Sequence, residues 1–211
     1  MKNHINLHVA SRKKSMAHIL HTAAAVFARR GFEGATTGEI AEKAGVAKAT
    51  IHYYFETKEG LYTSVLDQVL SDWAAAMSEI DVASGPMQAL SRYIRWKIDY
   101  SRREPDLTRV WAMEVISGAP HVQTFLHEKV RRLVEQKGHV VKSWIADDKM
   151  DPIDPAHLFF MLWALTQTYA ECEAQITVVL NKDALDEDDF QTANAVISRV
   201  LLKGLGITSA A

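Results

Sequence analysis

Cysteine is almost absent from this chain, because Cys172 is the only one among 211 residues. A single thiol rules out an intrachain disulfide and fits a reducing compartment. Long apolar runs are missing too: the longest covers residues 158–165, whereas a membrane-spanning helix needs about 20 residues. The N-terminus lacks the apolar segment of a signal peptide. We therefore expect a cytoplasmic protein with no membrane partner.

Proline is also scarce, and its five residues all lie between positions 86 and 155. Glycine and proline clusters separate segments whose apolar residues repeat at helical spacing, and no segment alternates like a strand. We predict an all-α fold of nine helices. They begin near Ser11 and end near residue 204, with later helices over residues 57–80, 86–103, 106–117, 120–146, 155–180 and 187–204.

Catalytic motifs are lacking as well. The sequence has no Gly-x-Ser-x-Gly, no His-Glu-x-x-His, no phosphate-binding glycine loop and no Cys/His set suited to zinc. We therefore expect neither an enzyme nor a bound cofactor or metal.

Charge is divided unevenly along the chain, although the whole sequence carries only −2. The first 64 residues contain nine Lys or Arg against five Asp or Glu, and the remaining 147 contain 15 against 21. A basic beginning followed by an acidic remainder indicates two parts that face different partners.

Two short predicted helices, separated by three residues, lie in the basic part. Gly45 is free to take a positive φ at the turn between them, and Ile40, Val46 and Ile51 would lock the helices together. Thr36 and Glu39 have the spacing of a capping box. Residues 37–56 therefore predict a helix-turn-helix, whose second helix, residues 48–55, enters the major groove of DNA. An ordinary helical hairpin is the alternative.

Polar side chains on the second helix and at helix starts are the candidates for DNA contact, because helix N-termini bind phosphates readily. For Tyr54 the sequence leaves two roles open, a phosphate contact or packing beside Phe55. The candidate DNA-binding residues are Thr36, Thr37, Lys48, Ala49, Thr50, His52, Tyr53, Tyr54 and Lys58. We predict a flexible arm over residues 1–11, a DNA-binding domain over 12–60 and an effector-binding and dimerisation domain over 61–211.

This segment resembles the TetR family of bacterial repressors over about residues 14–75. The matching residues are Phe27, Gly31-Phe32, Thr36-Thr37, Ile40-Ala41, Ala44-Gly45-Val46, Tyr53-Tyr54-Phe55, Lys58 and Leu61. The resemblance implies nine helices per chain and a homodimer through the last two helices of each chain. It also implies a ligand pocket between these helices and a DNA-binding head of three helices.

In the second domain, an effector site is predicted from polar residues on apolar helix faces, because buried polar groups need partners. Lys97 lies between Tyr93 and Ser101 on one face, and Gln167 lies one turn from Trp163. An internal ion pair between Lys97 and Glu114 is the alternative to a ligand. The candidate ligand-binding residues are Trp73, Lys97, Trp111, Glu114, Trp163 and Gln167.

Residues 60–180 further resemble regulators of pyrimidine utilisation within that family. The shared positions include Tyr93-Ile94-Arg95-Trp96-Lys97, Met113-Glu114, Gly118-Ala119-Pro120 and Thr166-Gln167. The resemblance implies that uracil or thymine is the effector and that its binding releases the DNA. Gln167 would then pair with the ring's N–H and carbonyl, Lys97 would bind a second carbonyl, and Trp73 would stack on the ring.

The sequence thus predicts a ligand-responsive repressor that binds double-stranded operator DNA as a homodimer. A regulator of an efflux or catabolic operon that responds to another hydrophobic compound is the first alternative. An enzyme is a distant one. An interaction module that does not bind DNA would leave the basic N-terminal part unexplained, and salt-dependent DNA binding separates it from a repressor.

Overall fold

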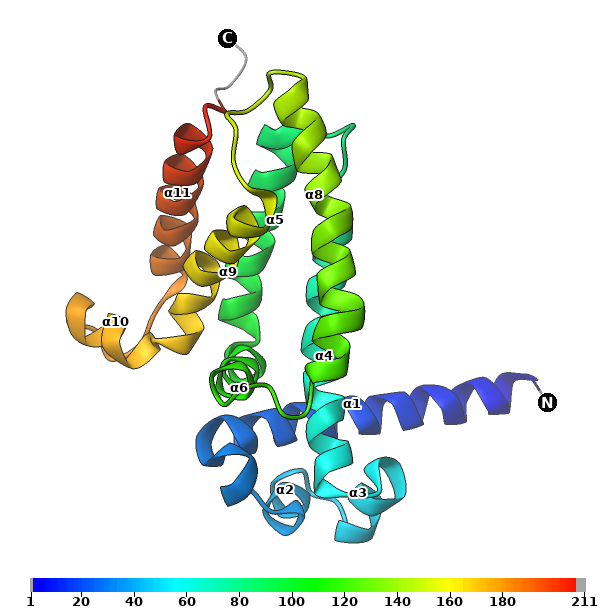
Figure 1. Cartoon of the computed structure of the whole chain (residues 1–211). Helices are drawn as coiled ribbons and strands as arrows, with labels where there is room; N and C mark the ends of the chain where they lie inside the picture. Colours follow the sequence, from blue (N-terminus) through cyan, green and yellow to red (C-terminus); the bar gives the residue numbers. More distant parts are fainter. Residues whose placement is uncertain (1, 208–211) are drawn as a thin grey trace. The chain divides into compact units, whose positions relative to one another are not determined.

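The computed structural model describes the backbone of residues 2–207 and the side chains of residues 12 and 14–207, and within this part the chain is helical with no strand. The predicted all-α fold is confirmed. The elements are α1 (Lys2–Gly34), α2 (Thr37–Lys43), α3 (Lys48–Phe55), α4 (Lys58–Ser78), α5 (Gly85–Arg103), α6 (Pro105–Ile116), α7 (Gln123–Phe125), the π-helical turn η1 (Leu126–Val130), α8 (Arg131–Ala146), α9 (Pro155–Glu171), α10 (Glu173–Leu180) and α11 (Glu187–Gly204) (Figure 1).

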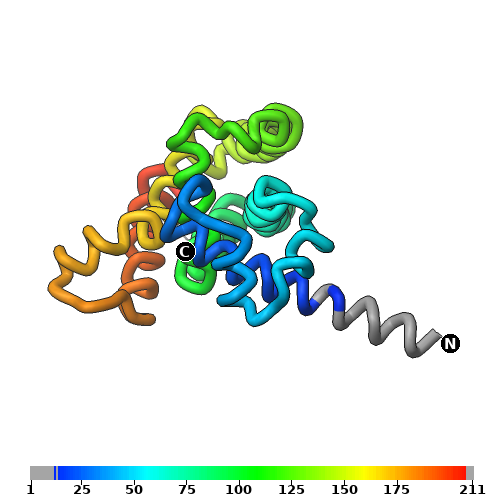
Figure 2. Tube along the Cα trace, turned by 90° about the horizontal axis from the view of Figure 1, so that it is seen from below, coloured from blue at the N-terminus to red at the C-terminus, as the bar shows by residue number. Residues whose placement is uncertain are grey.

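Three features differ from the predicted helices. The first helix begins at Lys2 rather than near Ser11, and no proline or glycine interrupts residues 2–30. The side chains of the predicted arm, residues 1–11, lie outside the described residues. The helix predicted up to residue 146 contains the π-helical turn, and the helix predicted over residues 155–180 breaks at Cys172, whose φ and ψ are −114° and 25°. The chain turns there, so that α10 departs from the axis of α9 (Figure 1, Figure 2).

The chain forms two compact units, which we call the head and the bundle. The head comprises Met1–Leu70 and Arg109–Val122, and the bundle comprises Ser71–Thr108 and Gln123–Ala211. Helices α4 and α6 each contribute residues to both units. The predicted functional division after residue 60 stays a prediction.

The head is built on an apolar stripe along α1. Ile19, Ala23 and Phe27 are fully buried, together with Ile40 of α2 and Ile51 of α3. The three residues of α1 recur at a spacing of four, so one face of that helix is apolar. Helix α2 packs against both α1 and α3.

The bundle is built around α5, which packs against α8, α9 and α11. Pro86 lies in the first turn of α5, where its missing N–H costs nothing. The core of the bundle joins aliphatic side chains of α5 to those of α9 and α11, and Trp144 of α8 is completely buried in it. No described helix is long and apolar enough to cross a membrane.

Candidate DNA interface and effector site

Helices α2 and α3 are joined by a tight turn at Gly45, whose φ is +64°. This left-handed conformation favours glycine because a Cβ would be strained there. The turn is tied to α1 by His18, whose Nε2–H donates to the carbonyl of Ala44 at 3.1 Å. The predicted helix-turn-helix is therefore present, with its second helix over the predicted residues.

The start of α2 is fixed by Thr36. Its Oγ1 accepts a hydrogen bond from the backbone N–H of Glu39 at 3.1 Å, as a capping residue does. The carboxylate of Glu39 pairs with Lys43 at 3.1 Å and with Arg29 at 3.4 Å. The hydrogen bond from Lys43 lowers the pKa of Glu39.

Helix α4 begins close against the end of α3. Thr57 Oγ1 accepts from the backbone N–H of Gly60 at 2.9 Å, as a helix-capping residue does. A Cβ on Gly60 would lie 2.3 Å from the carbonyl oxygen of Phe55. Only glycine permits this approach, so Gly60 fixes the distance between α3 and α4.

The outward face of α3 carries five of the predicted DNA-contact residues. Tyr53 exposes 72% of its surface, and Lys48, Ala49 and His52 are also exposed, while Thr50 is half-buried. The exposed hydroxyl of a tyrosine can donate a hydrogen bond to a phosphate oxygen. The face therefore offers a cation, hydroxyls and an imidazole to DNA.

Two interactions position the ends of this face. The Nδ1–H of His52 donates to the carbonyl of Glu56 at 2.9 Å, which leaves Nε2 for another partner. The guanidinium of Arg12 lies 5.8 Å from the ring centroid of Tyr53 and 5.5 Å from that of Tyr54. Arg12 therefore joins α1 to the polar face of α3.

The bundle contains a buried polar cluster that links α5 to α9. Lys97 of α5 is 1% exposed, and its Nζ donates to Oε1 of Gln167 at 3.1 Å. Nε2 of Gln167 in turn donates to Glu171 at 2.9 Å. Ser101 donates to the carbonyl of Thr166 at 3.0 Å, one turn further along α5.

Lys97 is also held by an aromatic ring. Its Nζ lies 3.3 Å from the ring centroid of Trp73, which comes from the part of α4 that belongs to the bundle. Burial lowers the pKa of Lys97 well below its usual value, while the attraction of Glu171 opposes this effect. The ammonium thus faces a ring and a neutral amide and reaches a carboxylate only through that amide.

The head holds a separate buried carboxylate. Glu114 of α6 is 2% exposed and accepts hydrogen bonds from the backbone N–H of His121 at 2.6 Å and from its Nδ1–H at 3.1 Å. The ring centroid of His121 lies 4.7 Å from that of Phe32 and 5.0 Å from that of Tyr62. The segment after α6 is therefore anchored to α1 and α4 of the head.

Comparison with known proteins agrees with this architecture. Residues 19–65 match the family model of bacterial regulatory proteins of the tetR family, and residues 66–208 match the model of the C-terminal region of YcdC-like protein. The HTH-type transcriptional regulator RutR of Escherichia coli (strain K12) is 36% identical over 197 residues, which cover 93% of this chain and 92% of that protein.

The chain belongs to the TetR family of bacterial regulatory proteins. It is a helix-turn-helix transcriptional regulator and not an enzyme. Members of this family bind operator DNA and small-molecule effectors and are typically dimers.

Two further proteins extend the comparison. The HTH-type transcriptional repressor NicS of Pseudomonas putida is 27% identical over 89% of this chain and 91% of that protein. A crystal structure of a tetR-family regulatory protein from Rhodococcus RHA1 has a TM-score of 0.72 at 18% identity, covering 93% of this chain and 99% of that one. The second match shows the fold alone.

Of the predicted effector residues in this TetR regulator, three meet directly: Trp73, Lys97 and Gln167. Trp163 belongs to the same unit, but its Nε1–H donates to the hydroxyl of Tyr93 at 3.0 Å. Trp111 and Glu114 belong to the head. The ion pair of Lys97 with Glu114, which the sequence left open as an alternative, is not formed. Lys97 donates to Gln167 instead, and Glu114 accepts from His121. That one ligand contacts all six residues stays a prediction.

Among the predicted DNA-binding residues, Lys58 stands apart. Its Nζ donates to the carbonyls of Phe32, Ala35 and Glu33 at 2.9, 3.3 and 3.4 Å. All three donors of the ammonium therefore serve the end of α1, where lysine is a common cap. A phosphate contact by Lys58 would have to displace one of them.

Three residues at these sites are not among the residues predicted from the sequence: Arg12, His121 and Glu171. Glu171 follows Gln167 by four positions on one helix, so helical spacing alone could have identified it. Arg12 contacts residues about 40 positions away in the sequence, and His121 contacts aromatic residues about 60 to 90 positions away. No local sequence pattern predicts these contacts.

Proposed function

We propose that this TetR regulator is a repressor that leaves its operator when a pyrimidine, uracil or thymine, binds at the cluster of Trp73, Lys97 and Gln167. The observation that carries the proposal is the buried ammonium of Lys97, which donates to Gln167 and lies against the ring of Trp73. Such a protein acts in the cytoplasm, where its operator DNA lies.

The chemistry of a pyrimidine fits these three side chains. Its ring presents an N–H donor beside a carbonyl acceptor, and the amide of Gln167 offers an acceptor beside a donor once the ligand replaces Lys97 and Glu171 as its partners. A second ring carbonyl can accept from Lys97, which in the present arrangement donates to a neutral amide. The face of Trp73 would stack on the flat ring after the ammonium of Lys97 turns from that face toward the ring carbonyl.

DNA binding is assigned to the outward face of α3. We expect Lys48 and Tyr53 to contact phosphates, and Thr50 and His52 to contact base edges, because phosphates position a protein and bases specify the sequence. The exposure of Lys48, His52 and Tyr53 supports this assignment. The roles of Thr36, Thr37, Ala49 and Tyr54 stay predictions of contact with the DNA backbone.

A homodimer through the last helices is part of the proposal. Several large apolar side chains of α9 and α11 are exposed in the single chain, and exposed apolar surface of this kind marks protein interfaces. They are Phe160, Met161, Leu165, Val196 and Val200. Two recognition helices, one from each chain, would then enter successive major grooves of a palindromic operator.

Helix α4 provides the route from effector to DNA, because it carries Trp73 in the bundle and begins at Lys58 beside α3. An effector that binds one conformation of α4 better than another shifts the population toward it. A coupling free energy of about 1–3 kcal/mol changes the affinity for DNA about 5- to 150-fold.

Calorimetric titration of uracil and thymine into the folded protein tests the effector assignment. We expect binding that is abolished by Gln167→Ala and kept by Gln136→Ala, an exposed glutamine of α8. An absence of heat with both pyrimidines, together with binding of an unrelated hydrophobic compound, would refute the pyrimidine assignment and favour a regulator of another operon.

A further inference from the structure

A ligand-sized groove in the bundle has no part in the proposed function. It is a groove of about 600 Å³ between α5 and α11, and small-molecule sites typically have volumes of about 300–1,000 Å³. We call it the α5–α11 groove. Its walls include Arg92, Arg95, Trp96 and Arg102 of α5, and Phe190 and Asn194 of α11.

The groove is separate from the Lys97 cluster. Arg95 precedes Lys97 by two residues, so about 200° of helix rotation separates the two side chains. Lys97 is buried inside the bundle, whereas Arg95 is exposed. A ligand on Arg95 therefore does not occupy the site of the proposed pyrimidine.

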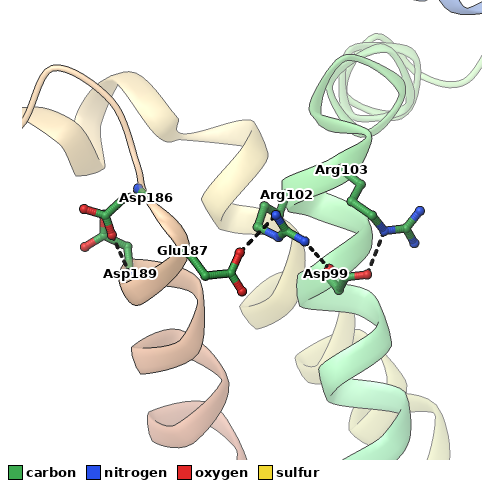
Figure 3. Close-up of polar contacts among 6 residues, drawn as sticks. All are labelled: Asp99, Arg102, Arg103, Asp186, Glu187 and Asp189. Atoms are coloured by element: carbon green, nitrogen blue, oxygen red, sulfur yellow. Dashed lines mark hydrogen bonds and ion pairs between the residues drawn. The ribbon is translucent and has the colours of Figure 1, made fainter.

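Two of the three arginines already have acceptors. Arg102 pairs with Asp99 at 3.0 Å and with Glu187 at 3.0 Å, which joins α5 to the start of α11 (Figure 3). Arg92 donates to the carbonyl of Glu79 at 3.1 Å and to Ser84 Oγ at 3.1 Å.

Arg95 lies along α5 between these two, and among the described residues it has neither an ion pair nor a hydrogen bond. With three arginines against Asp99 and Glu187, the groove keeps a positive balance. The free guanidinium can donate two parallel hydrogen bonds to a carboxylate.

The remaining walls fit a flat ring with a hydrogen-bond donor. Trp96 is stacked on Tyr100 with ring centroids 5.0 Å apart, so its orientation is fixed. Phe190 contacts Tyr169, with centroids 6.1 Å apart. The Oδ1 atom of Asn194 is buried and accepts no hydrogen bond within the described part of the chain. A buried acceptor without a donor costs free energy that a ligand O–H or N–H can recover.

From these contacts we propose that the α5–α11 groove binds a small aromatic carboxylate that carries a ring hydroxyl or amino group. The carboxylate pairs with Arg95, the ring packs against Trp96 and Phe190, and the ring donor reaches Oδ1 of Asn194 when that amide turns toward the groove. This makes the protein responsive to a second ligand that differs from the pyrimidine in charge.

The groove stays open in the proposed dimer. Val196 follows Glu187 by nine residues, which is about two and a half helical turns, so the two lie on opposite sides of α11. The apolar face of α11, Val196 and Val200, is therefore turned away from the groove wall formed by Glu187 and Asn194.

Titration of 4-hydroxybenzoate, followed by calorimetry and by protein NMR, tests this site. We expect saturable binding with a dissociation constant below about 10 mM, which both methods can measure. The neutral 4-hydroxybenzamide should bind at least about ten-fold more weakly, because it lacks the charge-assisted pair. Arg95→Gln should lower the affinity for 4-hydroxybenzoate by a similar factor. Arg132→Gln, which changes an exposed arginine of α8, should leave the affinity unchanged.

The result is distinguishable from that of the pyrimidine site. Binding of 4-hydroxybenzoate that survives Gln167→Ala and is weakened about ten-fold or more by Arg95→Gln supports the groove even if uracil does not bind. No binding to the wild-type protein overturns the proposal. So does binding that is unaffected by Arg95→Gln, or lost with Gln167→Ala, because the carboxylate would then lie elsewhere or at Lys97.

Discussion

At the residue scale, the protein keeps a buried lysine at a cost in stability. Lys97 is 1% exposed and donates to Gln167, and no carboxylate bonds it directly in the described structure. Burying a cation without a directly paired anion is unfavourable. Such a residue is typical of a binding site, where function is retained at the expense of stability.

We therefore expect Lys97→Met to raise the melting temperature, or leave it unchanged, while abolishing binding of uracil and thymine. Because burial lowers the pKa of Lys97 in the folded state, the wild-type protein loses stability as the pH falls below the unfolded value of about 10.4 toward the folded pKa. The advantage of Lys97→Met should thus be larger at neutral pH than at pH 10. Thermal unfolding at several pH values measures the difference in melting temperature between the two proteins. A strongly destabilised Lys97→Met variant would contradict this explanation.

At the element scale, the helices were largely predictable and their partners were not. The recognition helix, the turn at Gly45 and the cap at Thr57 follow from local spacing. The break at Cys172 carries no proline or glycine, so periodicity runs through it unchanged. The bond between Lys97 and Gln167 joins positions 70 residues apart. Tertiary packing creates such contacts, and local spacing does not encode them.

The approach of α4 to α3 gives one prediction at this scale. Gly60→Ala should destabilise the protein by about 1–3 kcal/mol, because the new Cβ collides with backbone that must then shift. Operator binding should weaken as well, since α3 is displaced. Gly204→Ala is the matched control, because a Cβ there meets open space. Chemical denaturation of both variants measures the difference, and equal stability would show that the contact relaxes freely.

The segment after α6, which is anchored by the contact of His121 with Glu114, gives a second prediction at this scale. His121→Leu removes one of the two side-chain donors of the buried Glu114 and leaves the hydroxyl of Tyr62 as the other, which should cost about 1–3 kcal/mol. His139→Leu, at an exposed position of α8, should cost little. Urea unfolding distinguishes them, and a stable His121→Leu protein would mean that Glu114 finds another donor.

At the scale of the whole molecule, the account requires two chains. Replacing Val196 and Val200 together by glutamate should give monomers in sedimentation experiments and weaken operator binding, because charge placed on an apolar interface must be desolvated. Val82→Glu changes a similarly exposed valine outside α9–α11 and should leave the dimer intact. A dimeric double variant would place the interface elsewhere.

The central claim is that a pyrimidine at the Lys97 cluster controls DNA binding by the head. The most direct measurement is fluorescence anisotropy of a labelled duplex, obtained by selecting random DNA on the protein, with increasing uracil or thymine. We predict that one of them weakens DNA binding by about 5- to 150-fold, and that Gln167→Ala binds the DNA normally without responding. Pyrimidine binding that leaves the affinity for DNA unchanged, or equal release from the Gln167→Ala protein, would contradict the claim.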